Sequence, residues 1–143
     1  MSKNWSKRGT IVEFALILPL LLFLIFVVFD LGSIQVVDHA SFSAAREGAR
    51  TYARTGDVNA SRTSAQNTFN TMASNFGTIQ SVEFYPVNRS GQSFIEAVVT
   101  AKVTANHFSF AWKFLGQQPT VNVIQKKMIY PIEEKQGSEE FWN

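Results

Sequence analysis

The chain has 143 residues, a formal charge of +2 at pH 7 and no cysteine. This length favours one domain. So small a charge, without a block of Lys and Arg, argues against a nucleic-acid-binding surface. The absence of cysteine excludes disulfides and thiolate metal sites.

The first feature along the chain is an apolar run over residues 14–29, which carries no charge. Counted back through Glu13 to residue 10, the run reaches about twenty residues, the number that an α-helix needs to cross about 30 Å of hydrocarbon. We therefore expect a transmembrane helix over residues 10–30. Pro19 lies inside it and marks a kink, which helices in lipid tolerate.

Residues 1–9 precede this span and form a basic leader with Lys3, Lys7 and Arg8 and no acid. The positive-inside rule places this end in the cytoplasm and the rest of the chain, after the span, outside it. A secretory signal peptide also begins with a basic stretch before an apolar run. The run is longer than a usual signal core, however, and no A-x-A-like site follows it closely.

Glu13 is the ionisable residue inside the run, three residues from its start. Carboxylates within the bilayer are costly and are functional candidates by default. The alternative is that Glu13 lies at the headgroup boundary and reaches water, where that cost is small. Both interpretations stay open on the residues alone.

Beyond the span the helical pattern continues in amphipathic form to residue 55, and Gly56 supplies its stop. Asp57 is placed to cap a second helix over residues 58–76, which Gly77 is expected to close. Among the outward charges of the first helix, Arg46, Glu47 and Arg50 are candidates for partner contacts. Such charges are more often ordinary solvated side chains.

The period then changes to two, which predicts strands at residues 81–87, 94–105 and 120–130, with a turn at 88–93 and Pro131 as the end of the last strand. The alternation is interrupted in phase near Lys126 and Lys127. We expect an α+β fold over residues 31–132, an extracytoplasmic domain with the long N-terminal helix and a second helix on a small antiparallel β-sheet. Residues 133–143 are expected to form a flexible tail.

The aromatic segment 107–115 allows two interpretations, either a cover over the open end of the sheet or an apolar patch for a partner. Catalytic patterns are missing. The two histidines, His39 and His107, belong to no metal or triad motif, and no P-loop, GxGxxG or GxSxG occurs. We expect no enzyme activity, no cofactor and no metal.

Three separated blocks carry a family resemblance: GTIVEFALILP at residues 9–19, DLG at 30–32 and AAREGAR at 44–50. In this order they resemble the TadE-like proteins, minor pilins or pseudopilins of tight-adherence (Flp, type IVc) pilus systems. The resemblance implies a pilin-like fold in the cell membrane. It also implies partners among membrane lipid, other pilin-like subunits and the pilus assembly platform, and a prepilin peptidase that cleaves after Gly9.

In such a protein, Glu13 would be the acid that follows the cleavage site, and it could pair with the new amine on Thr10 of a neighbouring subunit. Only three residues separate Gly9 from Glu13, whereas the family pattern has four. Cleavage at the shorter spacing, cleavage elsewhere and an uncleaved bitopic protein all stay open.

Two other classes of function compete with this one. A bitopic binding module of the cell envelope would use the helix only as a tether, so an unrelated span could replace it. An anchored enzyme is the remaining alternative, and a turnover assay abolished by changing His39 or His107 would favour it.

Overall fold

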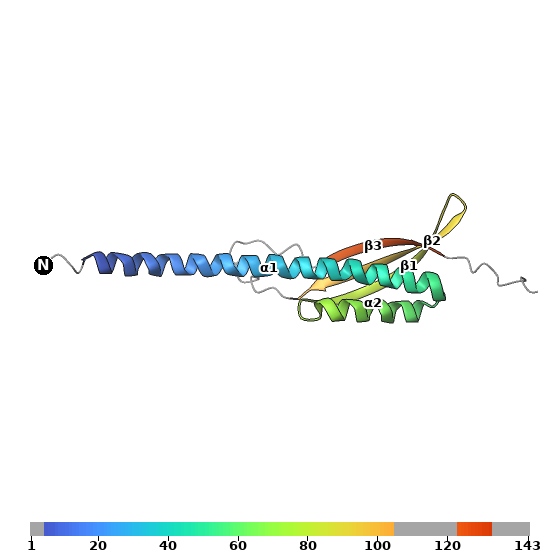
Figure 1. Ribbon diagram of the computed structural model, residues 1–143, viewed down its shortest axis with the longest axis horizontal. Coiled ribbons are helices and arrows are strands. Elements are labelled where there is room, and N and C mark those ends of the chain that lie inside the picture. The colour runs from blue at the N-terminus through green and yellow to red at the C-terminus, as the bar shows by residue number, and fades with distance from the viewer. Residues whose placement is uncertain (1–4, 105–122, 133–143) are drawn as a thin grey trace, which may run out of the picture.

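A computed structural model describes residues 5–104 and 123–132 of the chain, with side chains from residue 11 onwards. Its elements, in chain order, are α1 (Trp5–Thr55), α2 (Val58–Ala73), β1 (Gly77–Arg89), β2 (Gln92–Val103) and β3 (Val123–Pro131). The N-terminal half of α1 stands clear of the other described elements, and its C-terminal half lies beside α2 and the sheet (Figure 1). This confirms the predicted α+β fold.

The first helix, α1, is continuous from the predicted leader into the folded domain. It begins at Trp5, inside residues 1–9, and its 51 residues correspond to about 77 Å. Pro19 lies within it, and the kink expected there remains a prediction. Gly56 ends the helix as predicted: its φ is +70°, and its N–H donates to Tyr52 O at 2.8 Å.

The second helix, α2, begins as the sequence predicts but ends earlier. Asp57 is extended, and its Oδ1 accepts hydrogen bonds from the backbone N–H of Asn59 at 2.7 Å and of Ala60 at 3.3 Å. The helix stops at Ala73, so the prediction that Gly77 closes it is wrong. Gly77 is instead the first residue of β1.

The sheet has the order β1-β2-β3, and both pairs of strands are antiparallel. The hairpin between β1 and β2 turns on Ser90 and Gly91, which both have positive φ, as a two-residue turn of type I′ requires. The predicted six-residue turn was therefore too long, and the strands extend into it. Along β1 the register shifts between Ile79 and Ser81.

The third strand, β3, explains the interrupted alternation near Lys126 and Lys127. Lys126 faces α1, where its Nζ lies 2.7 Å from Asp38 Oδ1. Lys127 takes the opposite face, with its Nζ 3.7 Å from Glu96 Oε1. The alternation is thus regular in space, and a lysine occupies an inward position because α1 supplies a carboxylate. The predictions for residues 107–115 and 133–143 lie outside the described residues.

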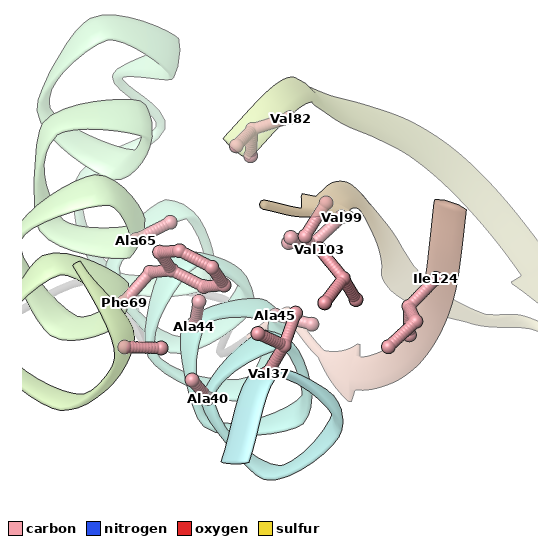
Figure 2. Close-up of a cluster of buried hydrophobic side chains, with 12 residues drawn as sticks. Val37, Ala40, Ala44, Ala45, Ala65, Phe69, Val82, Val99, Val103 and Ile124 are labelled. Atoms are coloured by element: carbon pink, nitrogen blue, oxygen red, sulfur yellow. The ribbon is translucent and has the colours of Figure 1, made fainter. Parts of the chain in front are cut away.

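The core lies between one layer of two helices and one layer of sheet. Labelled side chains from α1, α2 and all three strands point toward one another in Figure 2. Phe69 of α2 is the largest of the fully buried side chains. The others in this cluster are smaller, chiefly alanine and valine: Val37, Ala40, Ala44, Ala45, Ala65, Ala73, Val82, Val99, Ala101, Val103 and Ile124.

We predict that Gly77→Ala destabilises the domain by about 1–3 kcal/mol, the usual cost of overpacking. A Cβ at Gly77 would lie 2.8 Å from Lys102 O and 2.8 Å from Val37 Cγ2, and the carbonyl cannot move without disturbing the β1–β2 pair. Urea unfolding of the full chain in detergent micelles measures the change.

Gly32→Ala is the matched control, because nothing lies within 4 Å of a Cβ at Gly32. Alanine is also the better helix former, so this variant should be neutral or slightly more stable. Equal stability of the two variants would contradict the close approach at Gly77.

Candidate assembly surfaces of the long helix

The N-terminal half of α1 exposes a run of large apolar side chains. They extend from Ile11 to Leu31, and their exposed fractions range from 39% at Ile25 to 73% at Leu16. This length corresponds to about 30 Å of helix, the thickness of a bilayer core. In the described part of the chain, α1 is the one helix long and apolar enough to cross a membrane. It fits a single-pass membrane protein, since a core helix of similar composition would be buried.

The candidate residues near the start of α1 lie on one helix but meet no other described element. Gly9 and Thr10 belong to its backbone, and Glu13 follows about one turn later with an exposed side chain. Pro19 lies further along the exposed run. Processing at Gly9 and pairing through Thr10 and Glu13 therefore stay predictions.

Burial begins abruptly at Ser33, which is 3% exposed. From there the inward face of α1 consists mostly of small residues, which allow α2 and the sheet to approach closely. At Gly48, a Cβ would lie 3.2 Å from Ala65 Cβ and 3.3 Å from Phe84 Cζ. The helix thus changes from a largely exposed apolar surface to the centre of the core.

The block AAREGAR at residues 44–50 divides into two faces. Ala44, Ala45, Gly48 and Ala49 are buried against α2 and the sheet. The charged residues Arg46, Glu47 and Arg50 point outward, and the contact between Arg50 Nη1 and Glu47 Oε2 is long, 3.9 Å. Half of the motif is therefore structural, and the other half is available to a partner.

The outward face borders a hollow of about 730 Å³. From α1 it is lined by Phe42, Ser43, Arg46, Glu47 and Arg50. The other walls are Ser64, Asn67 and Thr68 of α2 and Tyr130 of β3. The structure thus brings the three predicted contact residues together. Sequence reasoning missed the other lining residues, because only the helix–helix and helix–strand packing places them there.

No catalytic arrangement forms among Asp38, His39 and Ser41 of α1. His39 is exposed, whereas Ser41 is buried and its hydroxyl donates to Val37 O at 2.7 Å. Asp38 is engaged by Lys126. These three side chains therefore have separate structural surroundings, as their helical spacing indicated.

On the outer face of the sheet, Tyr85 lies between two acids. Its hydroxyl donates a hydrogen bond to Glu83 Oε2, and Glu96 is its partner across the strands. The hydrogen bond to Glu83, followed by the charge of Glu83, raises the pKa of Tyr85. This face therefore carries more negative charge around Tyr85 than the outward face of α1 does around Arg46.

These features define a class of protein: a membrane-anchored α+β domain whose anchor and central core helix are one element. Residues 9–50 match a family model described as TadE-like protein. This confirms the resemblance that the three sequence blocks predict. A TadE-like domain indicates a protein associated with a Tad pilus, in a family of structural proteins rather than known enzymes. No curated protein and no solved structure matches the chain.

The whole family match lies on α1. It includes the exposed apolar run, the start of the small inward face and the outward charges of residues 46–50. The second helix and the sheet lie outside the match, which covers less than a third of the chain. The likeness therefore concerns one helix with three surfaces.

We predict that substitutions on the two faces of the AAREGAR block differ in their effect on the free energy of unfolding. Gly48→Leu should destabilise the domain by about 1–3 kcal/mol, because its side chain would collide with Ala65 and Phe84. Arg46→Ala, an outward substitution in the same block, should stay within about 0.5 kcal/mol of the wild type. Thermal unfolding in micelles checks both, and a large loss for Arg46→Ala would contradict the division.

We predict that Glu83→Gln lowers the pKa of Tyr85 toward its ordinary value. The raised pKa means that the folded state favours the protonated phenol. This contribution to stability is present below the unfolded pKa of about 10 and is lost as the pH rises through the folded value. Tyrosinate absorbance, with Tyr85→Phe subtracted, follows the titration. Glu47→Gln is the control, and equal titration curves for the two glutamine variants would refute the assignment.

Proposed function

We propose that the chain is a minor pilin or pseudopilin that takes part in assembling a Flp/Tad-type pilus through helix–helix association. The observation that carries this proposal is the exposed apolar half of α1, which continues without a break into the core of the folded domain. Such a helix offers its whole apolar length to other helices, inside the bilayer or inside a filament. The match over residues 9–50 supports the same role.

The topology proposed with this role has the N-terminus in the cytoplasm and residues 31–132 outside the membrane. It is supported by Lys3, Lys7 and Arg8 before the apolar run. A prepilin peptidase would then remove the leader after Gly9. If it does, mass spectrometry of the natively expressed protein finds Thr10 as the first residue. An intact leader would exclude processing and favour a bitopic protein that stays in the membrane.

Glu13 is the proposed register residue of the assembly. In an apolar surrounding, its carboxylate is costly unless a cation pairs with it, and the amine created on Thr10 of a neighbouring subunit would be such a cation. The exposed position of Glu13 on α1 is compatible with a contact between chains. This pairing would set the axial position of one helix relative to the next.

We predict that Glu13→Ala leaves membrane insertion intact but weakens association between subunits about tenfold or more, because the partner amine loses its counter-charge. Crosslinking in membranes, normalised to the inserted amount, measures the effect. Glu83→Ala, which removes an exposed carboxylate on the outer face of the sheet, is the control. Equal crosslinking of wild type and Glu13→Ala would exclude the pairing.

A membrane-tethered binding module is the second candidate, and the polar hollow beside Arg46 and Arg50 favours it. In that case the helix before residue 31 is only an anchor. Replacing residues 11–29 with an unrelated transmembrane sequence separates the two functions. A pilin-like subunit should lose both piliation in the cell and co-purification with pilus components, whereas a tethered module should keep its activity. Normal piliation in a deletion strain would count against the pilus role altogether.

A further inference from the structure

The outward face of α1 carries an arginine stripe, defined as Arg46, Arg50 and Arg54, all three of which are exposed. They are spaced four residues apart and therefore lie above one another on the helix. Like charges at this spacing destabilise a helix by a small amount, although Arg54, in the last turn of α1, also interacts favourably with the helix dipole. Glu47 is the one acid of the described residues that contacts the stripe, at 3.9 Å from Arg50. The stripe therefore holds an excess of positive charge.

The last described part of the chain runs directly past this stripe. Tyr130 of β3 lines the hollow beside Arg46 and Arg50. Ile132 packs against the buried cluster that includes Ala49 and Ala53 of α1. These two alanines immediately precede Arg50 and Arg54 in sequence, so the chain leaves the fold next to the stripe.

The eleven residues that follow Ile132 have the complementary charge. Residues 133–143 contain four glutamates and one lysine, beginning with Glu133 and Glu134 and continuing with Glu139 and Glu140. A segment of this length spans up to about 36 Å when extended. The distance along α1 from residue 54 back to residue 42 is only about 18 Å. The segment is therefore long enough to cover the stripe and the hollow.

We propose that the acidic C-terminal segment, residues 133–143, docks in the hollow of its own chain, with its glutamates on the arginine stripe. The polar wall of α2, including Asn67, offers hydrogen-bonding groups on the other side. At the far end, Phe42 exposes 43% of its surface and gives Phe141 and Trp142 an apolar contact. This occupant is favoured over a separate molecule because the chain delivers it at the edge of the hollow.

Because the chain has no cysteine, a designed pair of cysteines can report the contact without background. Asn67→Cys places one thiol on the wall of the hollow, and Gly137→Cys places the other in the middle of the segment. The full chain in detergent micelles is oxidised, and the disulfide is quantified by mass spectrometry. Gln125→Cys is the matched control for Asn67→Cys, since it puts an exposed thiol on the outer face of the sheet.

The expected result is a disulfide within one chain for Asn67→Cys with Gly137→Cys, formed several times faster than with Gln125→Cys. Reversing the charge of the stripe with Arg46→Glu and Arg50→Glu should slow disulfide formation about three- to tenfold, the range for a few exposed ion pairs. High salt should slow it similarly. Thermal unfolding confirms that the stripe variants remain folded.

Three results would overturn the proposal. Equal rates for Asn67→Cys and Gln125→Cys would show that the segment does not prefer the hollow. A rate unchanged by reversing the stripe would remove the arginines from the contact. Mixing two copies of the chain that differ in mass distinguishes a disulfide within one chain from a disulfide between two chains. Disulfides found only between chains would mean that the segment of a second copy occupies the hollow.

Discussion

The fold depends on the close approach of α1 to α2 and the sheet, and that approach depends on the small residues along the inward face of α1. Large side chains there would hold the three elements apart, because protein interiors are packed without space to spare. Gly48 shows how little room exists, with Ala65 and Phe84 both within 3.4 Å of where its Cβ would be. The domain thus encloses a core chiefly of alanine and valine, in which Phe69 is the largest fully buried side chain among the described residues.

The two halves of α1 suit different surroundings, which favour different side chains on the helix surface. Toward the N-terminus, large apolar side chains lie exposed, which suits the hydrocarbon of a bilayer. In lipid, helices associate through van der Waals packing rather than through removal of apolar surface from water. From Ser33 onward, the helix turns a small apolar face inward and charges outward, a pattern that suits a domain in water. The family match follows this transition from one end to the other, since it extends from residue 9 to residue 50. The matched segment of this chain is therefore a helix suited to both surroundings.

Sequence patterns predicted the types and order of the elements. They did not predict the positions at which tertiary contacts, rather than local signals, explain the residue. The cap at Asp57 and the stop at Gly56 are local signals, and both were confirmed. Gly77 carries the same local signal as a helix stop, yet its reason is tertiary: Val37 and Lys102 leave no room for a side chain. Lys126 interrupts the alternation of apolar residues in the sequence, because its inward position is explained by Asp38, a partner far away in sequence. The hollow beside Arg46 could not be predicted, because its walls come from three separate elements.

Continuity through the membrane boundary has a geometric consequence. Since no flexible linker separates the apolar run from the core, the rotation of the domain about the helix axis follows that of its anchor. One residue inserted near Gly32 would rotate the domain by about 100° about the helix axis and lift it by about 1.5 Å. Four inserted residues would bring it round to within about 40° of its starting direction, one turn higher. The continuous helix thus couples the rotation and the height of the domain to those of its anchor.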